Sequence, residues 1–186
     1  DFLTKAGRNS PYFFNLGAFN DGESLKRLGE FYANKIIGTK IEFDMIFGPA
    51  YKGIPLVSTL SIALSNKSKN IPYSFNRKEA KDHGEGGEIV GSPIKGNVLV
   101  IDDVISAGTS INESYKLIHN NGATIAGVIV AIDRQEKGEN TLTATQEIAK
   151  KYSIPVISII NLEDIINYLE ITNGFINELE LIKKYQ

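Results

Sequence analysis

The sequence contains no cysteine, which excludes disulfides, thiol nucleophiles and cysteine-ligated metals. Its 186 residues carry a formal net charge of −2, which argues against binding nucleic acid through strong overall electrostatics. No apolar run approaches the about 18 residues that a transmembrane helix needs, and no secretory signal pattern opens the chain. These absences favour a cytoplasmic enzyme or regulator, with neither a nucleic acid nor a membrane as partner.

Methionine is scarce as well. The chain begins at Asp1 and its single methionine is Met45, so we expect its start to be incomplete or processed. The length suits a single domain, residues 1–186, and hydrophobic residues make up 42% of the chain, enough for a sizeable core.

Apolar runs alternate with helical periodicity along most of the chain. Strands are expected at residues 43–47, 72–75, 98–101, 127–132 and 156–160. Helical patterns separate most of them, and this alternation predicts βαβ units in an α/β fold. We therefore expect a mainly parallel five-stranded sheet flanked by helices, with the core at residues 40–160. An aromatic, turn-rich segment at 1–20 and helices at 161–186 lie outside the alternation.

The stretch from Val98 to Ser110 carries the strongest functional signal. Four apolar residues fit a buried strand, and Asp102 and Asp103 follow it at the strand end where open α/β sheets bind ligands. Gly108 permits a positive φ, and Thr109 or Ser110 is expected to cap the next helix. Carboxylates for hydroxyls or metal-bound water, then a helix start for phosphate, suit a phosphorylated sugar. Alternatively, the aspartates are ordinary caps in a strand–helix loop.

Two further segments are rich in groups that bind anions. Residues 76–87 place three cations and a histidine among three glycines, a composition typical of an exposed lid or binding loop. The alternative is a solvated charged hairpin. Residues 48–53 predict a tight turn whose N–H groups and Lys52 face a pyrophosphate, unless the turn only joins a strand to a helix.

Together these segments resemble a known family. Val98–Ser110 is similar to the phosphoribosyl pyrophosphate (PRPP) motif of type I phosphoribosyltransferases, and Arg77–Gly87 resembles the catalytic loop of the orotate phosphoribosyltransferase family. Residues 4–14, 47–55 and 132–136 resemble that family's orotate-side segment, its pyrophosphate loop and the segment after its fourth core strand. The resemblance covers nearly the whole chain, except for a leading helical segment that the family usually has.

The resemblance implies a fold, a reaction and an assembly. The fold is that of type I phosphoribosyltransferases, with a small hood made by residues 1–20 and the C-terminal elements. The reaction transfers the 5-phosphoribosyl group from PRPP to orotate, giving orotidine 5′-monophosphate and pyrophosphate in pyrimidine nucleotide synthesis. Mg²⁺ is the implied cofactor, held mainly by PRPP and waters without a firm protein ligand. The implied assembly is a homodimer in which a flexible catalytic loop, residues 76–91, reaches the partner's active site.

The resemblance also implies roles for individual residues. The catalytic set is Arg77, Lys81, His83, Asp102 and Asp103, with the largest single effect expected at Lys81. The PRPP-binding set is Lys5, Tyr51, Lys52, Arg77, Lys78, Lys81, His83, Asp102, Asp103, Val104, Ile105, Ser106, Ala107, Gly108, Thr109 and Ser110. The orotate-binding set is Lys5, Phe13, Phe14, Ser106 and Arg134.

From the residues alone, several of these positions have a structural alternative. A lysine near a chain end, such as Lys5, is normally solvated, and the adjacent aromatics Phe13–Phe14 are equally suited to a core. Arg134 follows a buried strand, where a salt bridge to Asp133 or Glu136 would satisfy it.

Two other functions are compatible with a PRPP motif. A PRPP-binding regulator of transcription or RNA would keep the fold but needs no lid rich in cations. A phosphoribosyltransferase for another base would have no evident use for an arginine and an aromatic segment that together suit a pyrimidine carboxylate. Competition between bases would discriminate these possibilities.

Overall fold

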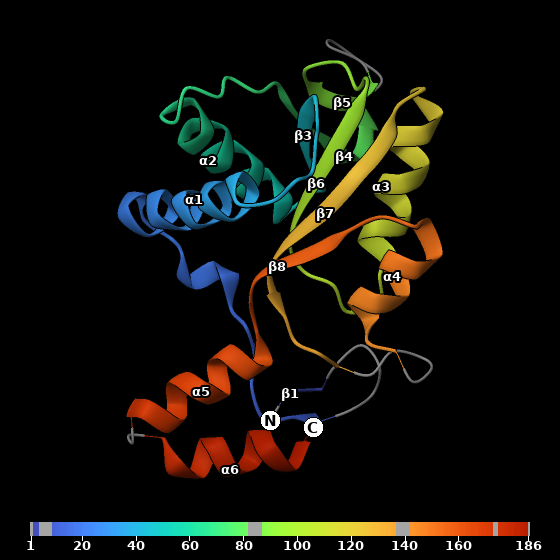
Figure 1. The fold of residues 1–186 in the computed structure, drawn as a ribbon. Helices are drawn as coiled ribbons and strands as arrows, with labels where there is room; N and C mark the ends of the chain where they lie inside the picture. Colours follow the sequence, from blue (N-terminus) through green and yellow to red (C-terminus); the bar gives the residue numbers. More distant parts are fainter. Residues whose placement is uncertain (1, 4–8, 82–86, 137–141, 173–174, 186) are drawn as a thin grey trace.

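The computed structural model describes residues 2–3, 9–81, 87–136, 142–172 and 175–185. Its centre is a six-stranded sheet in the order β5-β4-β3-β6-β7-β8 (Figure 1). All neighbouring pairs are parallel except β4 and β5, which are antiparallel. The strands are β3 (Met45–Gly48), β4 (Tyr73–Lys81), β5 (Gly87–Gly91), β6 (Asn97–Val104), β7 (Thr124–Asp133) and β8 (Val156–Asn161). The expected α/β fold with a mainly parallel sheet is confirmed.

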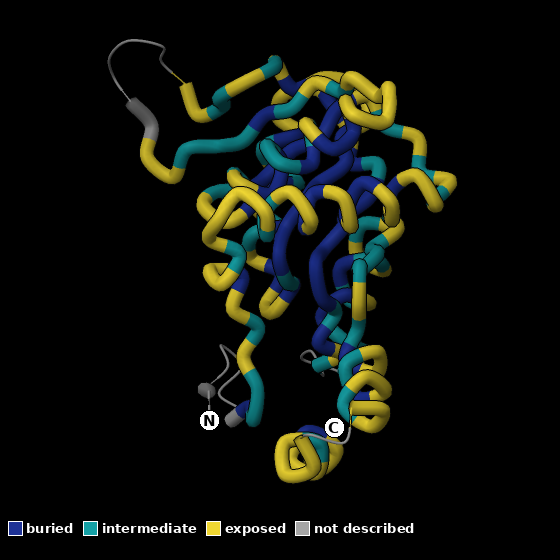
Figure 2. Tube along the Cα trace, turned by 90° about the vertical axis from the view of Figure 1, so that its left-hand side faces the viewer, coloured by how far each residue is buried: buried dark blue, intermediate teal, exposed yellow. Residues whose placement is uncertain are grey.

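Four helices cover the two faces of this sheet. One face carries α1 (Gly22–Ile37) and α2 (Gly53–Ser65), and the other carries α3 (Thr109–Asn120) and α4 (Ala144–Tyr152) (Figure 1). The central strands are therefore buried on both sides, as the dark core of Figure 2 shows, which explains their continuous apolar runs. In α1, Asp21 and Ser24 form a capping box at the start, and Gly38 follows the end.

The predicted strand count was wrong, because the sheet has a sixth described strand, β5. This strand begins and ends with glycine and is exposed or half-buried, so it lacks an apolar pattern. Backbone hydrogen bonds along β4 hold it in place, and these do not depend on side-chain type. The flexible loop expected over residues 76–91 is therefore largely a β-hairpin: 76–81 and 87–91 are strand, and 82–86 lie outside the described residues.

A separate layer lies beyond one end of the sheet (Figure 1). It contains β1 (Phe2–Leu3) paired antiparallel with β2 (Asn9–Ser10), α5 (Leu162–Thr172) and α6 (Ile176–Tyr185). The short helix η1 (Leu16–Ala18) packs instead against the main core, through Leu16. Leu162, Ile166 and Ile182 form the small core of the separate layer, and Tyr12 from the N-terminal segment packs against them. The two chain ends thus pack together as a hood. No helix among the described residues combines the length and hydrophobicity required to cross a bilayer.

Candidate active site

A cavity of about 340 Å³ opens where β3, β6 and β7 end. Four segments that are far apart in the sequence line it, together with one residue of the hairpin. The lining residues are Phe13, Pro49, Ala50, Tyr51, Lys52, Lys78, residues 102–111, Arg134 and Glu136. Most of the residues expected to bind PRPP or orotate therefore surround a single space.

Asp102 and Asp103 form the buried floor of this cavity. Both lie in β6, which runs three residues further than the predicted strand, and their side chains are almost fully buried. Lys52 Nζ lies 2.6 Å from Asp103 Oδ2, and the hydroxyl of Tyr32 on α1 donates to the backbone carbonyl of Asp102 at 2.7 Å. Neither aspartate caps α3, so the explanation of the pair as ordinary helix caps is wrong.

The environment of Asp102 disfavours its charge. Burial is the main cause that raises the pKa of Asp102 to about 7, and the neighbouring charge of Asp103 raises it further. Hydrogen bonds from the backbone N–H of Asp103 and from the hydroxyl of Ser110 oppose this rise in pKa. A carboxyl group that titrates near neutral pH inside a cleft is typical of a functional site. It can accept hydrogen bonds from sugar hydroxyls when ionised.

The turn after β6 leads directly into α3. The expected cap by Thr109 or Ser110 is wrong, because α3 begins at Thr109 with Gly108 as its N-cap and without a side-chain cap hydrogen bond. Gly108 has a φ of +68°, as its glycine predicted, and a Cβ there would lie 2.8 Å from Ile148 Cδ1. The first N–H groups of a helix have no partner within the helix, so this end of α3 suits an anion.

The turn after β3 forms a second wall. Lys52 precedes α2 as its N-cap, and the N–H of Gly53 donates to the carbonyl of Pro49 at 2.9 Å. Asn76 on β4 accepts the N–H of Ala50 through Oδ1 at 2.8 Å. This contact anchors the turn to the base of the hairpin. The turn does join a strand to a helix, and it also brings Tyr51 and Lys52 to the cavity.

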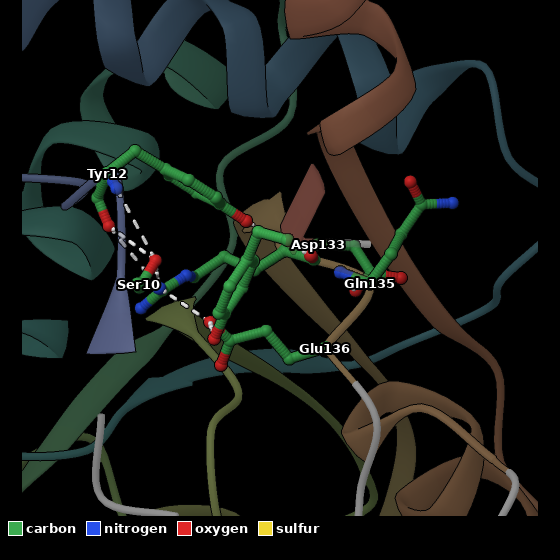
Figure 3. Close-up of polar contacts among 7 residues, drawn as sticks. Ser10, Tyr12, Asp133, Gln135 and Glu136 are labelled. Atoms are coloured by element: carbon green, nitrogen blue, oxygen red, sulfur yellow. Dashed lines mark hydrogen bonds and ion pairs between the residues drawn. The ribbon is translucent and has the colours of Figure 1, made fainter. Parts of the chain in front are cut away.

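Phe13 and Arg134 form the wall on the hood side. Phe13 lines the cavity, whereas Phe14 packs against the core beneath α1 and α2, which is the core alternative for this residue. Arg134 follows β7 and is buried; its Nη2 lies 2.6 Å from Glu136 Oε1 and 3.0 Å from Ser10 Oγ (Figure 3). The alternative salt bridge to Glu136 is therefore present, while Arg134 also faces the cavity.

The cations of the hairpin are placed differently from one another. Lys78 lines the cavity and also lies 3.9 Å from Glu113 on α3. Arg77 lines a neighbouring hollow of about 240 Å³ instead and donates to the carbonyl of Gly87 at 3.2 Å. The side chain of Lys81, and all of Lys5 and His83, lie outside the described residues, so their roles remain predictions.

The residues present fit a cation that binds together with its ligand. Among the described parts of the chain, no group of three or more histidine or carboxylate side chains is arranged to hold a metal. Two adjacent carboxylates at the cavity floor nevertheless offer the oxygen chemistry that Mg²⁺ prefers when phosphate oxygens and waters complete its shell.

Some residues that shape the site were missed by sequence reasoning. Tyr32 and Tyr185 lie in helices, and their neighbours in the sequence do not indicate which group each hydroxyl contacts. The hydroxyl of Tyr32 donates to the carbonyl of Asp102, and that of Tyr185 donates to Glu136 Oε1. Asn76 begins a charged segment in which the cations carry the functional signal, and nothing in the sequence links its amide to the turn at Ala50. Only Glu136 had a usable signal, since it lies two residues after Arg134 and was considered as its partner.

Comparisons with known proteins agree with this geometry. The family model of the phosphoribosyl transferase domain matches residues 15–156. Orotate phosphoribosyltransferases of Nitrosospira multiformis and Thiobacillus denitrificans are 58% and 54% identical over 186 residues, covering 100% of this chain and 82% and 88% of theirs. The crystal structure of the Francisella tularensis orotate phosphoribosyltransferase superposes with a TM-score of 0.86 at 42% identity, covering 99% of this chain and 89% of that one. The chain therefore belongs to the orotate phosphoribosyltransferase family.

Proposed function

We propose that this chain transfers the 5-phosphoribosyl group from PRPP to orotate with the help of Mg²⁺, forming orotidine 5′-monophosphate and pyrophosphate in pyrimidine nucleotide synthesis. The observation that carries the proposal is the single cavity that joins a carboxylate pair and a helix start to a buried arginine. The first two suit a phosphorylated sugar, and the third suits the carboxylate of a planar base.

PRPP is expected to lie along the β6 side of the cavity. Its 5′-phosphate meets the turn 105–109 and the first N–H groups of α3, where the helix dipole favours an anion. Its ribose hydroxyls meet Asp102 and Asp103, which accept hydrogen bonds when ionised. Its pyrophosphate lies against the turn 49–52, where backbone N–H groups and Lys52 supply donors and charge.

Orotate is expected to lie between this sugar and the hood. The planar guanidinium of Arg134 suits the orotate carboxylate, because two N–H groups can bind two oxygens in parallel. Phe13 offers an aromatic surface for the pyrimidine, and Ser106 a hydroxyl for its edge. This placement sets the ring nitrogen of orotate toward the anomeric carbon of PRPP.

The reaction exchanges one bond for another at that carbon. The bond from the anomeric carbon to the pyrophosphate oxygen breaks as the ring nitrogen of orotate bonds to that carbon, through an oxocarbenium-like transition state. The pyrophosphate leaves with the bonding electron pair, and the proton of the ring N–H passes to the departing pyrophosphate or to solvent. Lys52, Lys78, Lys81, Arg77 and His83 would stabilise the charge that develops on the departing pyrophosphate. Mg²⁺, bound to PRPP oxygens beside Asp102 and Asp103, would supply further neutralisation of this charge. Positioning and exclusion of water provide the rest.

The position of the hairpin supports a homodimer with a shared active site. Its described arms extend away from the body of the molecule in Figure 2, while Lys78 at its base stays at the cavity of its own chain. Cations further along the hairpin would then serve the partner's cavity. Heterodimers of complementary inactive variants, Lys81→Ala with Asp103→Asn, should recover activity, and complete lack of recovery would count against a shared site.

The test is the loss of orotate absorbance with PRPP and Mg²⁺ for the parent chain and Lys81→Ala. Lys116→Ala, which removes an exposed lysine of α3, is the matched control. We expect turnover by the parent and the control, and a decrease of at least ~100-fold in Lys81→Ala. A folded parent that binds PRPP without consuming orotate would favour a regulator or another base. Unchanged turnover in Lys81→Ala would refute the role given to the hairpin.

A further inference from the structure

Arg134 belongs to a polar cluster that joins the cavity to the hood, here called the Arg134 cluster: Ser10, Tyr12, Arg134, Glu136 and Tyr185. These residues come from the N-terminal segment, the segment directly after β7 and the last turn of α6; Figure 3 shows Ser10, Tyr12 and Glu136. Glu136 Oε1 accepts from Arg134 Nη2 at 2.6 Å and from the hydroxyl of Tyr185 at 3.3 Å. One carboxylate oxygen therefore connects α6 to the arginine.

The other contacts of the cluster restrain the same guanidinium. Its Nη2 also donates to Ser10 Oγ at 3.0 Å, and the ring of Tyr12 lies 4.9 Å from its central carbon. The hydroxyl of Tyr12 donates back to the carbonyl of Arg134 at 3.2 Å, and Tyr12 packs edge-on against Tyr185. The arginine is thus held at its backbone, at one nitrogen and over its plane.

The ion pair between Arg134 and Glu136 is important for the geometry of the site because it is buried. The side chains of Arg134 and Glu136 are only 7% and 10% exposed. A buried charge without a partner is strongly unfavourable, whereas a buried ion pair with further hydrogen bonds is tolerated and fixed in geometry. Both side chains also line the cavity, so the carboxylate that orients Arg134 lies beside the space where a ligand carboxylate would bind.

We infer that Glu136 is a positioning residue for Arg134, and that Tyr185 makes α6 part of the carboxylate-recognising wall. The inference rests on the proposed function, in which Arg134 binds the carboxylate of orotate. An arginine side chain has many rotamers, and ordering it on binding weakens affinity. The Arg134 cluster orders it during folding, so that the guanidinium already faces the cavity when the ligand arrives. Specificity for a carboxylated pyrimidine therefore depends on the hood.

Two nucleotides that differ by one carboxylate separate this role from a structural one. Orotidine 5′-monophosphate carries the carboxylate and uridine 5′-monophosphate does not, while their sugar and phosphate are the same. Binding of each is measured by calorimetry for the parent, Glu136→Gln and Tyr185→Phe. Tyr168→Phe is the matched control, because it removes the hydroxyl of an exposed tyrosine on α5.

We expect the affinity for orotidine 5′-monophosphate to fall about 10-fold in Glu136→Gln and about 3-fold in Tyr185→Phe, with uridine 5′-monophosphate unaffected within about 2-fold. The KM for orotate should rise in parallel while the KM for PRPP stays constant. Equal losses for both nucleotides would indicate a structural role and overturn the inference. Unchanged or tighter binding of orotidine 5′-monophosphate would also overturn it. Glu136 would then have no effect on Arg134, or would compete with the ligand carboxylate for its guanidinium.

The same titrations distinguish failure of this inference from failure of the proposed function. A parent that binds both nucleotides equally well would refute the assignment of Arg134 to the carboxylate, and the inference with it. A parent that consumes orotate and prefers orotidine 5′-monophosphate, while both variants keep that preference, would refute the positioning role alone.

Discussion

Replacing Asp102 by asparagine should stabilise the ligand-free protein at neutral pH while impairing its activity. The asparagine amide has nearly the shape of the carboxyl group, and its oxygen can still accept the backbone N–H of Asp103, which lies 2.9 Å from Asp102 Oδ1. The substitution therefore removes a charge that is buried at 6% exposure next to another carboxylate. A residue kept ionised for its ligand at a cost in stability should behave in this way.

The magnitude follows from the pKa of Asp102, which burial raises to about 7. Between its ordinary value near 4 and about 7, the folded chain keeps a proton on Asp102 that the unfolded chain releases. The free energy of unfolding of the parent therefore decreases as the pH rises through this window, and changes no further from this group above about pH 8. At 1.36 kcal/mol per pH unit, the free energy of unfolding of Asp102→Asn relative to that of the parent should therefore increase by about 3 kcal/mol between pH 5 and pH 8.

Urea unfolding at pH 5, 6, 7 and 8, at one protein concentration, measures this difference. Glu180→Gln, which removes an exposed carboxylate of α6, is the control and should follow the parent at every pH. A gain of about 3 kcal/mol corresponds to about 6–12 °C in Tm for a chain of this size. A stability difference between Asp102→Asn and the parent that stays constant from pH 5 to pH 8 would refute the reasoning, because Asp102 would then ionise without a cost from burial.

Two further substitutions probe the turns that line the cavity. Gly108→Ala should lower the free energy of unfolding by about 1–2 kcal/mol because of its φ of +68°, and further because the added Cβ would lie 2.8 Å from Ile148 Cδ1. Urea unfolding measures this loss. Gly122→Ala is the control for the backbone contribution, since Gly122 has a φ of +74° but a Cβ there would meet no atom within 4 Å. Equal losses in both variants would exclude the steric part. Asn76→Ala removes the acceptor that holds the N–H of Ala50, so the KM for PRPP should rise about 5-fold with the KM for orotate unchanged. Steady-state kinetics with each substrate varied checks this, and a KM for PRPP that is unchanged in Asn76→Ala would argue against a role of the hydrogen bond.

Much of the fold and part of the site could be predicted because the relevant signals are local. The apolar run before Asp102 marks a buried strand, since β6 has neighbours on both sides and helices on both faces. The glycine at 108 predicts a backbone that only glycine adopts readily, and its φ of +68° confirms this. Where the local signal was weak, as in β5, the prediction was wrong, because this edge strand is held by backbone pairing with β4 and has no fully buried residue.

The sequence by itself determined the kind of chemistry at the end of β6, since a strand, two carboxylates and a turn follow one another within a few residues. Tertiary structure alone decided which distant groups complete the site. The hydroxyl of Tyr32 reaches Asp102 across 70 residues, and Arg134 meets Ser10 across 124. Such contacts arise where separate elements pack, and the periodicity of a helix shows which face is buried without showing which polar group will meet it. The pair of aspartates can thus be recognised from one segment of the sequence. The pKa of Asp102 and the orientation of Arg134 depend on groups that only tertiary packing brings together.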